Sequence, residues 1–246
     1  DAMRNIQTPF SYRFYQAARN LAATLDIGIT TVRDAGGADL GIKRAQEDGL
    51  IGGPRLTISV RMVSQTGGHG DDWFPSGVEV PLFPGHPGLP DTIADGPDEM
   101  RRIVRTLVRY GAEVIKVATS GGVLSPRDKP THAHFRDEEL RVLVEEATAA
   151  GIPVMAHAQA SDGIKAAVRA GIRSIEHGIY LDDEAISLML ERGTWLVPTL
   201  VAPRGVIEAA EAGAQIPQAS RAQARAVGDI HRDAVARAVA AGVRGA

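Results

Sequence analysis

The sequence predicts an α/β protein built on a parallel sheet, because apolar strands alternate with helical segments along its 246 residues. Six stretches have the length and the β-branched composition of strands that are buried on both faces. None of the turns between them contains a G-x-G-x-x-G or P-loop motif, so a nucleotide-binding sheet is not supported. The alternation therefore favours a TIM-type (β/α)8 barrel that lacks some strands over a doubly wound sheet.

Two helices and two strands are predicted at the start of the chain. The first helix, 9–25, places apolar side chains on one face and ends at Gly28. The strand 29–34 is closed by a pair of glycines. The short helix 39–48 and the strand 55–60 follow it.

A long loop rich in glycine and proline, 64–96, precedes the rest of the chain, and a loop of this length is usually functional or mobile. After it the elements alternate regularly. Pro97 and the acidic residues behind it start a helix, and Asp182 caps a later one. The predicted strands are 113–119, 152–157, 173–178 and 194–200, and the predicted helices are 96–110, 137–150, 161–170, 182–192 and 218–241.

Composition and charge exclude several classes of function. The formal net charge is −3, which does not favour binding to nucleic acid or to an acidic membrane. The chain has no cysteine, so a metal would need His, Asp, Glu or a modified Lys as its ligand. No apolar run approaches the ~20 residues of a membrane span and no export signal is visible, which predicts a cytoplasmic location. The chain starts at Asp1 rather than Met and stops at Ala246, so we expect both ends to be cut from a longer chain.

Lys116, His157 and His177 lie at or near the ends of three successive predicted strands. In a barrel of this type the carboxyl ends of the strands build the active site. A single histidine at such a position is more often a structural hydrogen-bonding group than a ligand. Two histidines on successive strands raise the odds of a metal site.

A lysine in the middle of a buried strand is costly unless it is paired, shifted in pKa or chemically changed. Lys116 therefore has three interpretations. It can extend its amine to solvent, or it can act as a Schiff-base nucleophile with a lowered pKa. It can also react with CO2 to become an anionic ligand that bridges two metal ions. The two histidines favour the last interpretation, because a Schiff base does not need them.

Six short stretches carry a resemblance to a known family: GITTVRD at 28–34, TGGHGD at 66–71, YGAEVIK at 110–116, SGGVLS at 120–125, MAH at 155–157 and SIEHG at 174–178. Together they resemble the amidohydrolase superfamily. The similarity is to its prolidase-like, carboxypeptidase-like and imidazolonepropionase-like metallohydrolases, which include amidases that degrade ochratoxin.

The resemblance implies one metal-dependent hydrolase barrel over residues 1–246, with strands two to seven present and strands one and eight missing. Lys116, in its carboxylated form, is implied to bridge two divalent metal ions, and two zinc ions are expected per complete site. His157 and His177 are implied to bind the second ion, so that all three residues form the catalytic and metal-binding set. The other ligands, a His-x-His pair on strand one and an aspartate on strand eight, would lie outside 1–246.

The implied reaction is hydrolysis of an amide or dipeptide-like C–N bond by a metal-activated hydroxide. Xaa-Pro and N-acyl amino acid bonds are among the candidates. The expected partner is a small-molecule or dipeptide-like substrate, with no nucleic acid and no membrane, and a homo-oligomer is left open. The pair His132 and His134 has the spelling of the missing ligands but lies in a loop before a helix, so we do not assign it.

Four residues are candidates to bind the substrate. His69 lies in the glycine loop and can contact the substrate, with capping of that loop as the alternative. Arg61 and Tyr180 lie near strand ends and are candidates to bind a substrate carboxylate. Related dipeptidases often carry Tyr or His at the position of Gln159, so recognition of a carboxylate is open here. We expect Glu176 to be a structural partner rather than a base.

Two other functions remain open from the sequence. A metal-free barrel that uses Lys116 as a Schiff-base amine would be a lyase. A chain without the ligands of the first metal ion would be a catalytically incompetent fragment.

Overall fold

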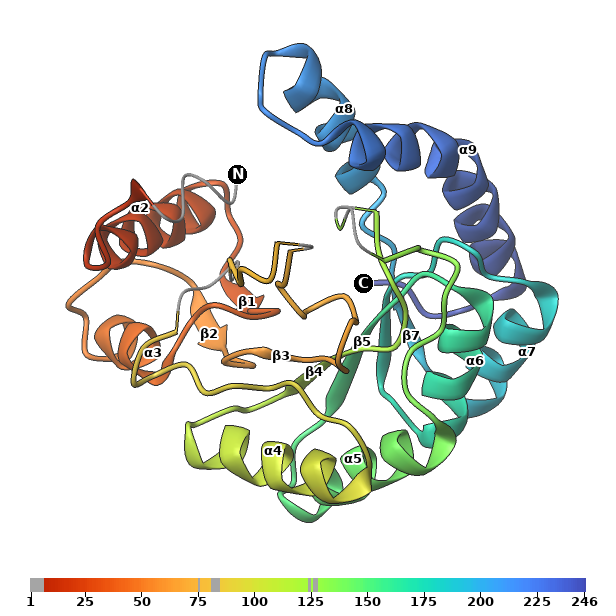
Figure 1. The fold of residues 1–246 in the computed structure, drawn as a ribbon, viewed down its shortest axis with the longest axis horizontal. Helices are drawn as coiled ribbons and strands as arrows, with labels where there is room; N and C mark the ends of the chain where they lie inside the picture. The colour runs from red at the N-terminus through yellow and green to blue at the C-terminus, as the bar shows by residue number, and fades with distance from the viewer. Residues whose placement is uncertain (1–6, 75, 81–84, 124, 126–127) are drawn as a thin grey trace.

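The computed structural model describes residues 7–74, 76–80, 85–123, 125 and 128–246, and it has an open ring of helices around short strands (Figure 1). The strands are β1 (Thr31–Arg33), β2 (Arg55–Thr57), β3 (Met62–Val63), β4 (Ile115–Ala118), β5 (Val154–Ala158), β6 (Ser174–His177) and β7 (Trp195–Val197). All strand pairs are parallel. β1 pairs with β2, and β3 to β7 form a second sheet in chain order. The prediction of an incomplete barrel is therefore confirmed, and the described strands do not close the ring.

The helices lie outside the strands, and all except α8 follow the predicted ranges closely. They are α2 (Tyr12–Asp26), α3 (Leu40–Glu47), α4 (Pro97–Arg109), α5 (Asp137–Ala149), α6 (Ser161–Ala170), α7 (Asp183–Arg192), α8 (Val201–Glu211) and α9 (Gln218–Ala241). Asp39 and Asp182 cap α3 and α7 by accepting a hydrogen bond from a backbone N–H of the first turn. Among the described helices, none combines the length and the apolar composition needed to cross a membrane.

The predicted strand 55–60 is too long, because β2 ends at Thr57 and the chain breaks before β3, which lies outside the predicted range. The break lies at Val60, whose φ of 65° is unusual for a β-branched residue. Before the break, the carbonyl of Ile58 accepts a hydrogen bond from the N–H of Glu113 at 2.8 Å. The bend then carries the chain into β3, which pairs with β4.

The region after β7 also differs from the prediction. The predicted strand 194–200 is shorter in the structure, because Pro198 has no N–H to donate and Thr199 has a φ of 49°. Helix α8 was not predicted, since Pro203 and Gly205 are both poor residues for a helix interior. Pro203 lies in the first turn of α8, where a missing N–H costs no helical hydrogen bond.

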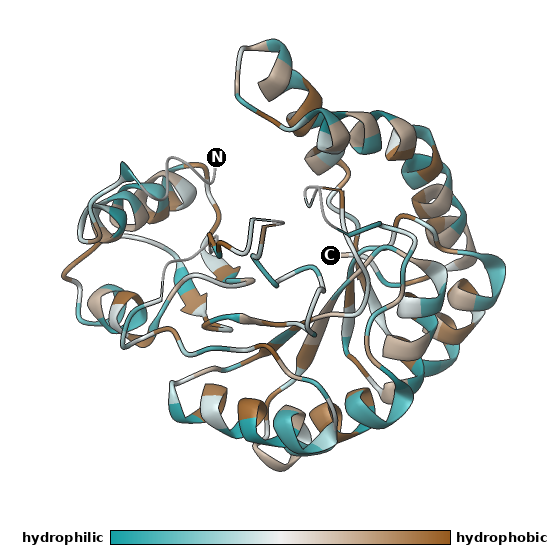
Figure 2. Ribbon diagram, viewed as in Figure 1, coloured by the Kyte–Doolittle hydropathy of each residue, from teal (hydrophilic) through white to brown (hydrophobic). Residues whose placement is uncertain are grey.

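The core lies between the strands and the helices that follow them. All residues of β4 and β5 are buried, and α4 buries Met100, Ile103, Val104 and Leu107. Figure 2 shows apolar residues on the strands and on the inward faces of these helices, with polar residues outside. Helix α2 differs, because it has no buried residue.

The last residues of the chain run parallel to β7. The N–H of Leu196 donates to the carbonyl of Arg244 at 2.8 Å, and the N–H of Ala246 donates to the carbonyl of Leu196 at 3.0 Å. Residues 244–246 thus extend the sheet in the same parallel sense as its other strands.

One ion pair crosses the interior between strands that are not neighbours. Arg33, on β1, donates to Glu176 Oε1 on β6 at 2.9 Å and to Ser174 Oγ at 3.0 Å. Ser174 also donates to Glu176 at 2.8 Å. The Glu176 side chain is 8% exposed and that of Arg33 is 33% exposed. This pair joins the small sheet to the large one.

We expect Arg33→Met to lower the free energy of unfolding by about 1–3 kcal/mol, because the buried Glu176 carboxylate loses its charged donor. Adding Glu176→Leu should recover part of the loss, since no charge is then left unpaired. Urea unfolding followed by circular dichroism measures both changes. As a control, Arg141→Met breaks an exposed pair with Glu145 and should cost less than about 0.5 kcal/mol. Equal losses for the two arginine variants would contradict a special role of the interior pair.

Candidate active site

Lys116, His157 and His177 come from β4, β5 and β6 and meet at one end of the large sheet. Lys116 and His157 are each 5% exposed. The ring centroids of His157 and His177 lie 4.7 Å apart, with the rings edge to face at 69°. The charge of Lys116 acts on both imidazoles. The structure thus brings together the three residues that the sequence predicted.

In His157 and in His177, one ring nitrogen is hydrogen-bonded to an oxygen atom of the protein. His157 Nε2 lies 3.1 Å from the carbonyl oxygen of Gly121, and a carbonyl can only accept, so this nitrogen carries the proton. In the neutral ring Nδ1 therefore has the lone pair. His177 Nδ1 lies 2.6 Å from Thr199 Oγ1, which leaves Nε2 as the nitrogen for a ligand. Both rings are oriented as metal-binding histidines commonly are.

Burial lowers the pKa of all three basic groups. Desolvation, followed by the neighbouring charges of His69, His177 and Lys116, holds the pKa of His157 well below its usual value. Desolvation and the charge of Lys116 lower the pKa of His177 to about 3. Desolvation lowers the pKa of Lys116 to about 8, although the charge of Glu176 acts in the opposite direction. At neutral pH the site therefore contains two neutral imidazoles and an amine that loses its proton readily.

His69 also enters this site, from the long loop after β3. Its ring stacks on that of His157 with centroids 4.1 Å apart and an angle of 19°. Its Nδ1 lies 3.0 Å from Asp128 Oδ2. The ring packs against Gly122 so closely that a Cβ at this residue would lie 2.2 Å from His69 Cε1. The predicted substrate-binding histidine is thus part of the same cluster as the predicted metal ligands.

A cavity of about 120 Å³ opens beside these rings. On one side it is polar, with His69, His157, His177 and Gln159. The remaining lining residues, most of them apolar and several from α8, are Val123, Ile179, Thr199, Ala202, Pro203, Val206 and His231. A substrate group in this cavity would have the imidazoles on one side and an apolar wall on the other.

The other predicted substrate-binding residues divide into two cases. Gln159 lines the cavity, and its Oε1 is buried without a hydrogen-bond partner among the described residues. Arg61 instead donates to the carbonyl of Pro90 at 3.2 Å, and Tyr180 packs against the apolar cluster behind the cavity. Neither Arg61 nor Tyr180 is among the lining residues, so their contact with a substrate carboxylate stays a prediction.

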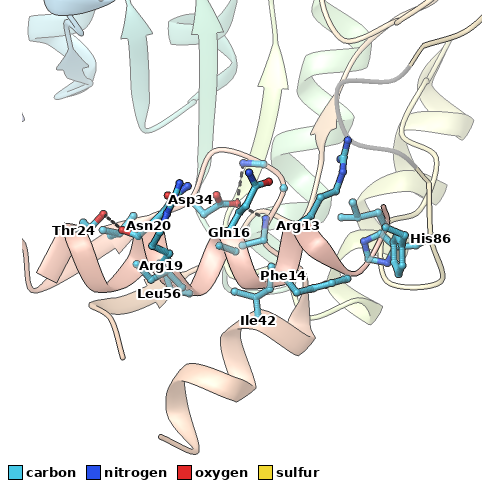
Figure 3. A pocket seen from close by; sticks show the side chains of 18 of the residues that line it. Arg13, Phe14, Gln16, Arg19, Asn20, Thr24, Asp34, Ile42, Leu56 and His86 are labelled. Atoms are coloured by element: carbon cyan, nitrogen blue, oxygen red, sulfur yellow. Dashed lines mark hydrogen bonds between the residues drawn. The ribbon is translucent and has the colours of Figure 1, made fainter. Parts of the chain in front are cut away.

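A larger cavity of about 620 Å³ lies elsewhere, between α2, β1 and α3 (Figure 3). Phe14 and Ile42 contribute apolar surface to it. Asp34 contributes a carboxylate that accepts from the N–H of Gly36 at 2.9 Å, and burial raises the pKa of this group. None of the predicted catalytic residues lines this cavity. Despite its smaller volume, the cavity beside the histidines is therefore the candidate active site.

The metal donors within the described residues are limited. No three side chains of His, Cys, Asp or Glu in this part of the chain are arranged to hold a metal ion. His132 and His134 lie in the loop before α5, as expected, and neither lines the cavity beside His157 and His177. Buried His134 is close enough to Asp128 and His69 for their charges to act on its pKa. The available donors are the two imidazoles of His157 and His177, together with Lys116. They fit a metal ion in their chemistry, because both rings are neutral and the lysine amine can react with CO2 once it is unprotonated.

Three polar residues of the site were not predicted from the sequence: Asp128, Thr199 and His231. The apolar lining residues were not predicted either. Asp128 lies in a loop with no regular pattern, and Thr199 follows a proline at a strand end. His231 lies on the buried face of α9, and its Nε2 donates to the carbonyl of His177 at 2.8 Å. A histidine on the apolar face of an alanine-rich helix is a signal in the sequence from which this role could have been predicted.

Comparison with known proteins gives two similarities in sequence. The family model described as the amidohydrolase family matches residues 2–246. Ochratoxinase from Aspergillus niger is 42% identical over 236 residues, which cover 92% of this chain and 48% of the relative. The chain thus spans about half the length of the curated relatives that it matches.

Solved structures agree with the sequence matches. The crystal structure of A. niger ochratoxinase superimposes with a TM-score of 0.85 and 37% identity, covering 100% of this chain and 58% of the other. A prolidase complexed with N-methylphosphonate-L-proline superimposes with a TM-score of 0.88 and 38% identity, covering 99% of this chain and 60% of the other. A Xaa-Pro dipeptidase with bound methionine superimposes with a TM-score of 0.83 and 31% identity, covering 98% of this chain and 60% of the other.

The burial of Lys116 leads to a titration that can be observed. In protein stripped of metal and kept free of CO2, we expect one lysine ε-carbon to titrate at about pH 8 in carbon-13 NMR of lysine-labelled protein, and Lys116→Met should remove this signal. Glu176→Gln should move the titration to lower pH, because Glu176 favours the charged amine. Lys165 is the internal comparison, since its carboxylate neighbours raise its pKa above the usual value. Titration of every lysine near the ordinary value of about 10.4 would contradict this prediction.

Proposed function

The chain belongs to the amidohydrolase family, and from this premise we propose that it carries part of the active site of a metal-dependent hydrolase. The proposed reaction is hydrolysis of the C–N bond of an amide or dipeptide-like substrate. The observation that carries the proposal is the meeting of Lys116, His157 and His177 at the ends of three successive strands, with both imidazoles kept neutral.

The donor set supports a divalent metal ion. His157 Nδ1 and His177 Nε2 would hold one ion, and the carboxylated form of Lys116 would supply an oxygen ligand that two ions can share. We infer zinc, with two ions per complete site, because imidazole and carboxylate-type oxygen both suit this metal. When bound, the metal supplies Lewis acidity, which lowers the pKa of water and polarises the substrate carbonyl.

The residues of this chain contribute binding and orientation. His69 lies against His157 and would hydrogen-bond the reacting end of the substrate. The side-chain amide of Gln159 would bind a polar group, since its Oε1 is buried and free of partners among the described residues. The wall of Val123, Ile179 and Val206 would bind an apolar group and exclude water from it.

The volume of the cavity supports a substrate with an aliphatic side chain. An apolar cavity of about 150 Å³ is known to hold a benzene molecule. The cavity here is about 120 Å³ and only one of its sides is apolar, so the apolar part suits a branched aliphatic group or a proline ring better than a phenyl ring. We therefore favour Xaa-Pro dipeptides and N-acyl aliphatic amino acids as the substrate class.

A second candidate is a lyase that forms a Schiff base at Lys116. The pKa of about 8 favours it, because a neutral amine attacks a carbonyl. The two oriented imidazoles favour the hydrolase. Borohydride trapping in the presence of a carbonyl substrate separates the two, because only the lyase would give a stable adduct on Lys116.

Metal analysis and hydrolysis by the full-length protein test the first proposal. With bicarbonate present we expect about two metal ions per chain. Lys116→Ala should lose metal and lower kcat/KM at least about 100-fold, because a shared ligand is gone. Lys129→Ala, an exposed lysine in the following loop, is the matched control and should behave as the wild type. Full hydrolysis by protein that contains no metal would reject the hydrolase mechanism.

The apolar wall leads to a specificity prediction. Val206→Trp should fill the cavity and lower kcat/KM for N-acyl-leucine about 10–200-fold, while N-acyl-glycine should change little. The matched control is Val201→Trp, because Val201 is exposed on the same helix and does not line the cavity. Initial rates with both substrates measure the ratio. An unchanged ratio for Val206→Trp would remove the aliphatic-pocket assignment.

A further inference from the structure

Asp128 is a buried carboxylate beside the site to which the proposed reaction assigns no role. Its side chain is 4% exposed. Its Oδ2 accepts a hydrogen bond from His69 Nδ1 at 3.0 Å and another from the N–H of Gly122 at 3.2 Å. Its Oδ1 is buried without a partner among the described residues. His69 and Gly122 therefore both bind this carboxylate through the same oxygen.

We propose that Asp128 is a positioning residue that fixes the ring orientation and the tautomer of His69. For its effect on catalysis, this inference rests on the proposed hydrolase function. Its effect on the His69 ring does not depend on that function, because the hydrogen bond exists in the protein without substrate.

The tautomer follows from the chemistry of the bond. Burial would raise the pKa of Asp128, but its hydrogen bonds from His69 and Ser125 outweigh this and lower it, so the group is an ionised carboxylate. A carboxylate only accepts, so His69 Nδ1 must carry the proton. Nε2 of the neutral ring then has the lone pair and is the nitrogen available to the cavity that His69 lines.

The other contacts of the ring do not fix this orientation. Stacking on His157 and packing on Gly122 confine the ring plane. A ring flipped by 180° within that plane would occupy nearly the same volume, with carbon and nitrogen positions exchanged. Among the contacts of the described residues, only the hydrogen bond to Asp128 distinguishes the two states. The bond also links the loop after β3, which carries His69, to the loop after β4, which carries Asp128.

A variant series tests the role of Asp128 in catalysis. Asp128→Asn can keep both hydrogen bonds, with its oxygen at the Oδ2 position and its amide at the unpartnered Oδ1 position, so kcat should stay within about fivefold of the wild type. Asp128→Ala should lower kcat about 10–100-fold with little change in KM. In a His69→Ala background, Asp128→Ala should cause no further loss. His132→Ala, an exposed histidine in the same loop, is the control.

Nitrogen-15 NMR of histidine-labelled protein tests the ring itself and needs no substrate. The wild type and Asp128→Asn should have His69 in the Nδ1–H tautomer, whereas Asp128→Ala should give a mixture. Gly122→Ala is a second probe, because its backbone suits alanine and the added Cβ would displace the His69 ring. It should reproduce the kinetic loss of Asp128→Ala.

The outcomes separate the two proposals. An unchanged His69 tautomer in Asp128→Ala would overturn the positioning role, as would additive losses of activity in the double variant with His69→Ala. If the wild type hydrolyses none of the amide substrates, the proposed function fails, and the tautomer measurement still decides the role of Asp128.

Discussion

The burial of the Lys116 amine inside a parallel sheet is the constraint on which the site depends. Desolvation makes its charged form unfavourable, and Glu176 is the carboxylate that counters this effect. Glu176, however, also receives two donors, from Arg33 and from Ser174. It is therefore a weakened partner for Lys116, and the amine keeps a pKa of about 8. The ion pair that joins β1 to β6 thus also makes the lysine chemically available.

The sequence predicted the elements that depend on local pattern and the residues fixed by strand ends. Strands with continuous apolar runs, such as those of Lys116 and His157, were found because burial on both faces leaves a clear composition. Parallel pairing of successive strands brings their carboxyl ends to one edge of the sheet, so the meeting of Lys116, His157 and His177 could also be predicted. The break at Val60 could not be predicted, because it reflects pairing with two different strands.

The parts of the site that sequence did not predict depend on contacts between distant loops. Asp128 meets His69 across 59 positions of the chain, and no periodicity links two loops of this kind. The apolar wall depends on α8, whose Pro203 and Gly205 obscure the helical pattern. Arg61 was a reasonable candidate for a substrate carboxylate, but its guanidinium donates to the carbonyl of Pro90 in the long loop after β3. Loops on a strand framework set specificity in this fold, so these loop contacts are where the substrate preference is determined.

A histidine of α9 stabilises a strained stretch of backbone at the site. His177 and Thr199 have φ values of 76° and 49°, a region that costs free energy for residues other than glycine. Their side chains bond each other at 2.6 Å, which joins the ends of β6 and β7. His231, buried in the middle of α9, donates a hydrogen bond to the carbonyl of His177. This bond stabilises the strained backbone conformation of His177. A strained backbone conformation of this kind persists only where several surrounding contacts impose it. The hydrogen bond from His231 is one such contact, which explains a histidine on the apolar face of α9.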